Sequence, residues 1–446
     1  MTETFDLIDL LNVNRDKGRI IWLCNIGAEK YWNKVNAGIS DSSEDIIVNH
    51  IEEMNLLLCR RQDIMLLREP PAPEYLEMLE LLGFSIPEIL TPENPDPSVP
   101  ISELVLKDDV LISKLREISG SDSQVFFVPY AVTTVEEQIA EKARLKLTGS
   151  SSAVNAKIND KIFNRQISET LGLPVCEGKV CLSIEEIRDE YRRLSEDCGF
   201  KRVIIKEPYG ASGKGLYIVD SQTKLEPVLR IISRFSRNDP NAKWLVEGWY
   251  EKKADINYQI YVSPSGKVTV FSIKQQLLND TVYIGSKLPP DLSEDEITQY
   301  QNYGRIIGEY LYSIGYSGVA GIDSIITKDS TIIPIIEING RFTLSTYISF
   351  LKQVIGDKTV LTRYFRLASR LRIGFDEFYS ILEDNDLDFK PDKKEGVIVY
   401  TSATLPVHAN REGTSFLGRI FTLVVAEGMS GIEYYNNRLE KLIEAI

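Results

Sequence analysis

Two neighbouring apolar segments carry acidic and amide side chains at a spacing suited to holding a cation. Residues 321–327 contain Asp323, and residues 331–341 contain Glu337 and Asn339. A short turn separates the segments, so we expect an antiparallel hairpin. Carboxylate and amide oxygens are ligands that Mg²⁺ prefers, and the phosphates of ATP would complete its coordination. The hairpin therefore predicts a site for magnesium, with Mn²⁺ as an alternative.

The register of this hairpin decides whether its acidic groups meet. If the turn closes at Thr331, Asp323 lies opposite Ile335 and diagonal to Glu337, with about 7 to 8 Å between the backbones. Side chains alternate between the faces of a strand, so Glu337 and every second residue up to Arg341 would share the face of Asp323. A polar face turned to solvent gives the same alternation. We favour the metal site because carboxylates among isoleucines are unfavourable without a cation.

An arginine ends the second segment, next to the predicted cation site. Arg341 could bind the carboxylate of a substrate and stabilise charge on a phosphoryl group in transfer. The alternative is a structural salt bridge to an acidic neighbour. We predict that Arg341 contributes to catalysis and to substrate binding.

A lysine ends the apolar strand predicted at 203–206, and a glycine-rich loop follows it. The charge of Lys206 is costly to bury unless an anion such as a phosphate pairs with it. Lys161, in the preceding predicted helix, would supply a second lysine, although a surface position is commoner for lysine. The loop residues expected to cover phosphates are Gly210, Ser212, Gly213 and Gly215. The loop is neither a Walker A motif nor a dinucleotide fingerprint, and a plain hairpin turn fits the glycines alone about equally well.

Residues 244–251 are typical of a strand lying along the adenine of a nucleotide. Glu247 is placed for the amino group of the base and Glu251 for a ribose hydroxyl, with Trp249 between them. An ordinary strand with a bulge fits the spacing equally well. Further candidates for contact with the acceptor substrate lie on a later strand and loop, where surface exposure is the default: Lys274, Gln276, Tyr283 and Ser286.

The elements expected to position these residues fall into three parts, in a fold of the α/β and α+β classes. Alternating strands and helices predict a Rossmann-like domain over 1–153, with strands at 19–26, 63–67 and 124–128 and a helix at 73–82. A second part over 154–375 would clamp a nucleotide between two subdomains that divide near 245. A small C-terminal unit over 376–446 would follow a charged linker at 383–395 and end in a helix from 436 to 445.

Composition excludes several classes of protein. The chain has 446 residues and a net charge of -14, which argues against nucleic-acid binding. It shows neither an apolar run long enough for a membrane span nor an export signal, so we expect a cytoplasmic protein without a membrane partner. Two histidines and five scattered cysteines offer almost no ligands for zinc. Chemistry must then rest on lysine, arginine, carboxylates and amides, which suit nucleotides.

Taken in order, Lys161, Lys206 with its glycine loop, the Glu247 segment, Asp323 and the run from Glu337 to Arg341 resemble the ATP-grasp superfamily. The resemblance covers roughly 155–350, and a preceding Rossmann-like domain is typical of the family. Within it, the chain is similar to the subgroup of the pheganomycin peptide ligase.

The resemblance also implies roles for individual residues. Lys161 and Lys206 would contact the phosphates of ATP, and Val246 and Glu247 the adenine. Two magnesium ions would be held by Asp323, Glu337 and Asn339, and the acyl phosphate by Arg341. Lys206 and Arg341 would carry catalysis, mainly by positioning and charge neutralisation.

The family reaction implies a ligase that converts ATP to ADP and phosphate and joins a carboxylate to an amine through an acyl phosphate. We expect amide or peptide bond formation on amino acids or peptides in secondary, antibiotic-type metabolism. Loading an amino acid onto the thiol of an acyl-carrier protein is the alternative, and the acidity of the chain counts mildly against it. Further alternatives are a non-catalytic nucleotide-binding protein and a kinase-like phosphotransferase. A homodimer is the expected assembly.

Overall fold

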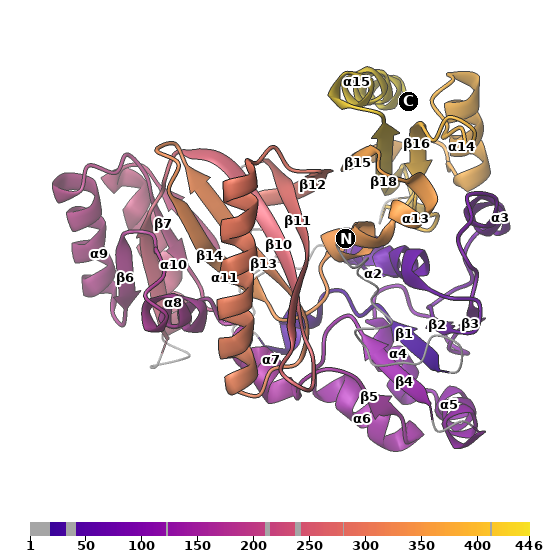
Figure 1. The fold of residues 1–446 in the computed structure, drawn as a ribbon, viewed down its shortest axis with the longest axis horizontal. Coiled ribbons are helices and arrows are strands. Elements are labelled where there is room, and N and C mark those ends of the chain that lie inside the picture. The colour runs from indigo at the N-terminus through magenta and orange to yellow at the C-terminus, as the bar shows by residue number, and fades with distance from the viewer. Residues whose placement is uncertain are drawn as a thin grey trace.

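The protein is described by a computed structural model over residues 18–32, 42–121, 124–209, 215–236, 242–279, 281–410 and 413–446. Three sheets organise these residues. Figure 1 shows the N-terminal part in indigo below the C-terminal part in yellow, with the middle of the chain beside them. No helix in these ranges is long and apolar enough to cross a membrane.

The N-terminal part is built on a five-stranded parallel sheet in the order β3-β2-β1-β4-β5. Its strands are β1 (Arg19–Leu23), β2 (Ile64–Leu66), β3 (Glu88–Leu90), β4 (Val125–Pro129) and β5 (Lys146–Leu147). Its helices are η1 (Ala28–Tyr31), α2 (Ser42–Asn49), η2 (His50–Leu58), α3 (Pro73–Leu81), α4 (Ile101–Lys107), α5 (Asp109–Ser121) and α6 (Thr134–Ala143). The predicted Rossmann-like architecture is confirmed. The sequence does not predict β3 and β5, because strands this short carry no readable alternation.

A four-stranded antiparallel sheet follows, in the order β6-β9-β7-β8. Its strands are β6 (Gly178–Cys181), β7 (Val203–Lys206), β8 (Leu216–Val219) and β9 (Trp244–Gly248). The helices of this region are α7 (Ser152–Ile158), α8 (Lys161–Thr170), α9 (Ile184–Arg192), η3 (Arg193–Asp197) and α10 (Gln222–Ser236). Val203, Ile205 and Val246 point into an apolar core on one side of the sheet. Residues of the opposite parity, Lys206 and Glu247, therefore lie on the other side.

The largest sheet has nine antiparallel strands, in the order β14-β13-β10-β11-β12-β15-β18-β16, with β17 paired to β18. Its first strands are β10 (Lys252–Val262), β11 (Val268–Asn279), β12 (Val282–Leu288), β13 (Gly318–Thr327) and β14 (Ile332–Asn339). The last are β15 (Thr359–Ser369), β16 (Gly396–Val399), β17 (His408–Ala409) and β18 (Phe416–Ala426). The C-terminal strands thus continue the sheet of the middle part, because β15 pairs with both β12 and β18.

The two faces of this sheet differ in chemistry. Helix α11 (Glu294–Ser313) packs against β10 and β11. The apolar side of β10 consists of Ile256, Tyr258 and Ile260, which belong to one buried cluster with residues of α11. Asn257 and Gln259 alternate with them and lie on the opposite, polar side. That polar side meets a segment made of α12 (Leu344–Tyr347), η4 (Ile348–Phe350) and α13 (Lys352–Ile355).

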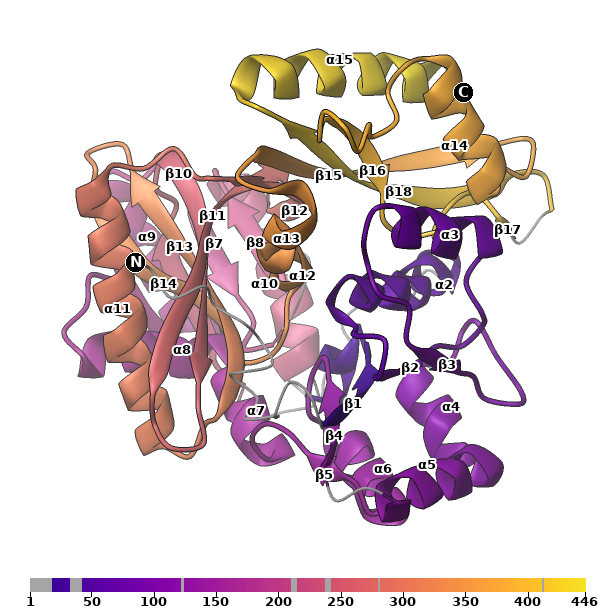
Figure 2. The ribbon, with the colours of Figure 1, turned by 45° about the vertical axis from the view of Figure 1, so that its right-hand side comes forward.

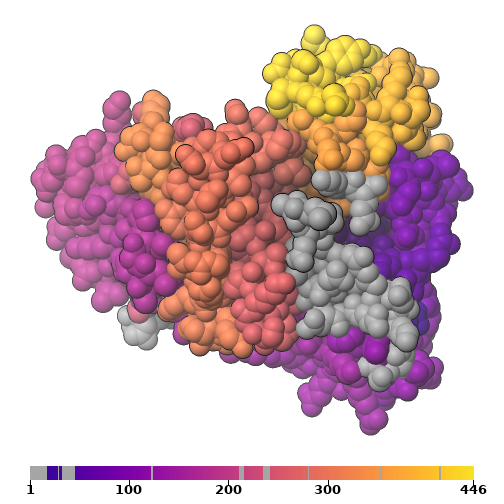
Figure 3. All heavy atoms as spheres, in the orientation of Figure 1, coloured from indigo at the N-terminus to yellow at the C-terminus, as the bar shows by residue number. Residues whose placement is uncertain are grey.

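The strands of the C-terminal part lie between helix α15 and the N-terminal part. Figure 2 shows α15 (Met429–Ala445) above the strands and α3 below them, and Figure 3 shows the yellow and indigo parts in contact. Helix α14 (Phe375–Asp384) precedes the stretch interpreted as a linker. That interpretation is wrong, because Leu387 and Phe389 are buried in the core. Helix α15 also begins earlier than the predicted 436. The domain boundaries at 153 and 375 stay predictions.

Buried polar groups connect the N-terminal and C-terminal parts. The carboxylate of Glu53, in η2, accepts hydrogen bonds from the backbone N–H groups of Ser402 and Ala403 and from the Ser402 hydroxyl. The rings of His50 and His408 stack beside this contact, with 4.3 Å between their centroids. Nδ1 of His50 donates to the carbonyl of Ile46 at 2.7 Å. The chain contains no other histidine.

The burial of His50 predicts a loss of stability in acid. Burial, with the charge of a protonated His408, lowers the pKa of His50 to about 3, against about 6.5 in an unfolded chain. Below pH 6.5 the unfolded state therefore binds the extra proton, and the free energy of unfolding falls with pH. Between pH 7 and pH 5 we expect a loss of about 2 kcal/mol from this group. Urea unfolding of the wild type and His50→Gln at both pH values measures it. An equal loss in both proteins would contradict the prediction.

Candidate active site

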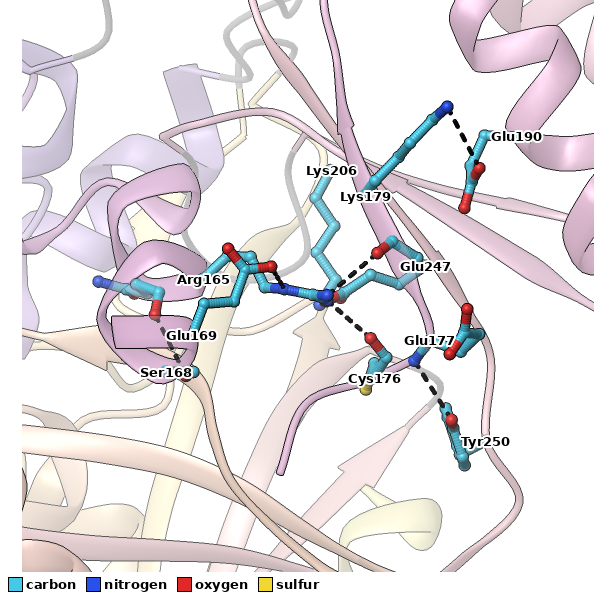
Figure 4. Close-up of polar contacts among 12 residues, drawn as sticks. Arg165, Ser168, Glu169, Cys176, Glu177, Lys179, Glu190, Lys206, Glu247 and Tyr250 are labelled. Carbon is cyan, nitrogen blue, oxygen red and sulfur yellow. Dashed lines mark hydrogen bonds and ion pairs between the residues drawn. The ribbon is translucent and has the colours of Figure 1, made fainter. Parts of the chain in front are cut away.

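The polar side of the four-stranded sheet brings two cations, Lys206 and Arg165, to the buried carboxylate of Glu247. Lys206 Nζ lies 2.6 Å from one carboxylate oxygen of Glu247, and Arg165 Nη1 lies 3.1 Å from the other. Figure 4 shows Lys206 and Arg165 converging on this side chain. Burial opposes the charged form of Lys206, but the negative groups around it, chiefly the carboxylate of Glu247, together raise the pKa of Lys206. The anion that pairs with Lys206 in this structure is therefore a group of the protein, the carboxylate of Glu247.

Helix α8 supplies two cations to the site from one of its faces. Lys161 and Arg165 lie one turn apart, at positions i and i+4. Lys161 is buried rather than exposed, and its Nζ lies 2.8 Å from the carboxylate of Glu337. Its backbone N–H donates to the carbonyl of Pro208, which fixes the start of α8 beside the end of β7. Arg165 is absent from the predicted site residues, although its spacing of four from Lys161 is a signal that places both on one face of the helix.

The strands β13 and β14 pair in a different register from the predicted one. The turn closes as expected, with the N–H of Thr327 donating to the carbonyl of Thr331. A bulge then follows, so that Asp323 lies directly opposite Glu337 instead of diagonal to it. Direct partners have Cβ atoms only about 4.5 to 5.5 Å apart. The predicted pairing of Asp323 with Ile335 is wrong, yet both carboxylates still share one face because the bulge preserves their parity.

The bulge has an identifiable cause in the sequence. Pro334 lies within it on β14, an edge strand of the sheet, where a proline removes no ladder hydrogen bond. The carbonyl groups that the bulge releases find side-chain donors. Tyr258 Oη donates to the carbonyl of Pro334 and Ser324 Oγ to that of Ile333, each at 2.8 Å.

Three amide side chains hold the carboxylate of Asp323. Asn257 and Gln276 donate to Oδ1 at 2.8 and 2.9 Å, and Asn339 donates to Oδ2 at 3.2 Å. The surrounding protein and the nearby charge of Glu337 raise the pKa of Asp323 to about 7. Two carboxylates held this close disfavour each other's charge, which a cation between them would relieve.

The oxygen ligands at this point suit a hard divalent cation. Asp323 and Glu337 face each other, and Asn339 adds an amide oxygen on the same face. Within the described ranges, no group of three or more histidine, cysteine or acidic residues could hold a metal alone. Magnesium usually takes one or two protein carboxylates and completes its shell with phosphates and water. The residues present therefore fit magnesium bound together with a nucleotide, whereas a cage made only of protein groups is absent from these ranges.

A polar network behind Asp323 fixes the orientation of Asn257. Its amide oxygen accepts hydrogen bonds from Gln259 at 2.6 Å and from Ser345 at 3.0 Å, so its nitrogen is left to donate to Asp323. Gly321 leaves room for this network, because a Cβ there would lie 2.7 Å from Thr343. The sequence analysis missed Asn257 and Gln259, although their alternation with apolar residues in β10 was a readable signal.

Arg341 does not continue the polar face of β14. The strand ends at Asn339, and the backbone turns so that the N–H of Arg341 donates to the Asn339 carbonyl. The guanidinium donates to Tyr130 Oη at 2.8 Å and lies over its ring, at the end of β4. The predicted alternation up to Arg341 is therefore wrong. Its charge nevertheless acts on Asp323, whose pKa it lowers slightly against the larger effects of burial and Glu337.

The strand predicted to contact adenine lies inside its sheet. Val246 pairs with Lys179 on one side and with Ile205 on the other. Trp249 lies half-buried between the charged groups of Arg202 and Lys252. Glu251 is exposed and pairs with Lys328 at 2.6 Å. Of the predicted loop residues, Gly215 is described, whereas Gly210, Ser212 and Gly213 lie outside the described residues.

The four candidates for substrate contact lie on β11 and β12, which are the second and third strands from the strand of Asp323. Gln276 reaches Asp323 directly, whereas Lys274 and Ser286 are fully buried. Tyr283 Oη and Ser286 Oγ are 2.8 Å apart, and Gln276 and Ser286 are paired across β11 and β12. These residues therefore form one continuous polar surface with the carboxylates.

Three family models match successive parts of the chain. Residues 51–145 match a family model described as the pre-ATP-grasp domain. Residues 166–345 match the ATP-grasp domain, and residues 379–439 match the PGM1 C-terminal domain. The candidate residues from Lys206 to Arg341 fall within the ATP-grasp match, whereas Lys161 and Arg165 lie just before it.

A curated relative matches most of the chain. The [butirosin acyl-carrier protein]--L-glutamate ligase of Niallia circulans is 28% identical over 380 residues, which cover 83% of this chain and 82% of that protein. Among solved structures, the N5-carboxyaminoimidazole synthetase of Staphylococcus aureus in complex with ADP has a TM-score of 0.54 at 11% identity, covering 96% of this chain and 97% of the other. The biotin carboxylase of Campylobacter jejuni has a TM-score of 0.55 at 15% identity, covering 95% and 89%. These two structures share the fold.

Proposed function

Because the chain belongs to the ATP-grasp superfamily and is an ATP-dependent ligase, we propose that it phosphorylates a carboxylate with ATP and joins the acyl group to an amine. The observation that carries this proposal is the direct pairing of Asp323 with Glu337, beside two buried lysines that are each bound to a carboxylate. Such a set can exchange partners when a triphosphate and a cation arrive together.

The exchange follows from the charges. Lys161 and Lys206 would turn from Glu337 and Glu247 to the phosphates, since a phosphate carries more negative charge than a carboxylate. Glu337 is then free to join Asp323 and Asn339 around magnesium. When bound there, magnesium neutralises phosphate charge and orients the terminal phosphoryl group. In this arrangement Gly215 would lie over the phosphates.

The remaining residues would position the two substrates. Glu247, near the end of β9, would contact the adenine, with Trp249 and Glu251 toward the ribose. The contact predicted for Val246 is wrong, because its side chain lies in the apolar core and its strand is paired on both sides. The γ-phosphoryl group moves to an oxygen of the carboxylate, and ADP leaves. Arg341 would leave Tyr130 and stabilise the acyl phosphate, and the amine then attacks the acyl carbon as phosphate departs with its electron pair. Gln276, Tyr283 and Ser286 would line the acceptor side.

A thiol in place of the amine is the second candidate. The relative from Niallia circulans is named as a ligase that joins glutamate to an acyl-carrier protein, which supports a carrier thiol as acceptor. The net charge of -14 disfavours a fast encounter with an acidic carrier. The same relative supports a place in antibiotic-type metabolism. A cytoplasmic location and a homodimer remain predictions.

A nucleotide-product assay tests the proposal. We would incubate the protein with Mg-ATP and pooled amino acids and peptides, in parallel with pooled carrier proteins, and separate ADP from AMP. We expect ADP and phosphate in amounts that depend on the pool. AMP and pyrophosphate would mean adenylation and would overturn the acyl-phosphate route.

A further inference from the structure

The proposed reaction must dispose of a proton, and this inference rests on that reaction. An amine is mostly an ammonium ion at neutral pH, and only its unprotonated form has the lone pair that attacks an acyl carbon. Most titratable groups near the site are already engaged. Asp323 and Glu337 would hold the cation, whereas Lys161 and Lys206 pair with carboxylates. The two histidines lie at the contact between the N-terminal and C-terminal parts.

Lys274 differs from the other buried lysines of the site. It is fully buried in β11, and its Nζ lies 2.6 Å from the hydroxyls of Ser272 and of Ser349. Within the described ranges, Lys274 forms no ion pair with a carboxylate. Both serines are half-buried, so their hydroxyls connect the buried nitrogen with the more open polar side of the sheet.

The sheet register places Lys274 in line with the carboxylates. Lys274 pairs with Asn257, Asn257 with Asp323, and Asp323 with Glu337, across four neighbouring strands. Directly paired residues share a face, so all four side chains lie on the polar side. Two strand spacings separate Lys274 from Asp323, which is about 10 Å. An acceptor amine next to a phosphorylated carboxylate would lie within this distance.

The groups around Lys274 favour its neutral form. The α12–η4 segment presents Ser345 and Ser349, and β10 presents Asn257 directly opposite, all of them uncharged. Asp255 lies diagonally on the same face of β10, where it pairs with Lys252 at 2.7 Å. On β12, Lys287 pairs with Gln275 and lies on the other face, while the charge of Asp323 lies beyond Asn257. Burial lowers the pKa of Lys274 to about 7. A sizeable fraction is therefore unprotonated at neutral pH.

We propose that Lys274, acting through the hydroxyl of Ser349, accepts the proton that the nucleophile loses. The ammonium of the acceptor gives a proton to Ser349 Oγ, and Ser349 passes its own hydroxyl proton to the neutral Nζ of Lys274. The freed lone pair forms the bond to the acyl carbon, and the bond from that carbon to the phosphate oxygen breaks with its electron pair going to the oxygen. The departing phosphate takes the second proton that the nitrogen loses as it becomes an amide. Lys274 acts on the substrate only through Ser349 and does not touch the substrate itself.

Hydroxylamine separates this role from a structural one. It is largely unprotonated at neutral pH, so it can trap an acyl phosphate as a hydroxamate without help from a base. In Lys274→Met we expect amide formation with the amino-acid pool to fall about 100-fold at pH 7, while hydroxamate formation stays within about 3-fold of the wild type. Amide formation should recover as pH rises and more free amine is present. Ser349→Ala should show the same pattern with a smaller loss.

The matched control is Lys253→Met on the neighbouring strand β10. Lys253 is half exposed and pairs with Glu296, so both activities should be unchanged. An equal loss of hydroxamate and amide in Lys274→Met and Ser349→Ala would overturn the inference, as would unchanged amide formation. A wild type that makes no hydroxamate would instead overturn the proposed function, and this inference with it.

Discussion

Glu337→Gln should lower the rate of ADP formation by at least about 100-fold. The substitution removes one charge from the carboxylate pair with Asp323, and a neutral amide cannot replace it in holding a divalent cation. It also releases Lys161, which pairs with Glu337 at 2.8 Å. Nucleotide binding without added magnesium should therefore be unchanged or tighter, while its dependence on magnesium should largely disappear.

Two measurements check this expectation. Steady-state ADP formation gives the rate, and titration calorimetry with and without magnesium gives the affinity for ATP. Glu309→Gln is the control, because Glu309 is exposed on α11 and pairs with Arg305 far from any group of the site. Unchanged turnover in Glu337→Gln would remove the metal assignment.

Lys206→Met should raise the KM for ATP and lower kcat/KM for ATP by about 100-fold or more. Methionine keeps the apolar stem in its buried strand but cannot pair with a phosphate. The change also leaves Glu247 with Arg165 as its remaining cation. Removing one partner from a buried pair commonly costs about 3 to 5 kcal/mol, so we expect a lower free energy of unfolding, moderated by Arg165.

A second variant separates the loss of activity from the loss of stability. Lys206→Met combined with Glu247→Gln removes the buried carboxylate as well, so part of the stability should return while activity stays low. Urea unfolding and ADP formation measure the two effects. Activity that recovers together with stability would show that Lys206 acts only through folding.

Much of the fold was predictable, because it follows from local patterns. Alternating strands and helices predicted the parallel sheet of the N-terminal part, β7 appears at the predicted 203–206, and β9 falls within the strand expected over 244–251. The charged stretch at 383–395 was misread because composition alone cannot show that Leu387 and Phe389 are buried against other elements. Burial there depends on contacts with segments distant in the sequence.

The candidate site, like the fold, has features that the sequence predicts and features that it does not. The sequence by itself determined which groups are available: few histidines, lysines at a strand end and a helix start, and acidic residues at even spacing in an apolar hairpin. These features fix which chemical groups are available and which side chains share a face of a strand, since alternation along a strand is a property of the backbone. They were sufficient to reveal the resemblance to the ATP-grasp superfamily and to predict that Asp323 and Glu337 share one face.

Only the tertiary structure decided how these groups pair. It set the bulge that brings Asp323 opposite Glu337, and the turn that sends Arg341 to Tyr130. It also buried Lys274 beneath a segment some 75 residues later in the chain. Register, strand ends and burial depend on contacts between distant segments, and their energies are absent from any local pattern.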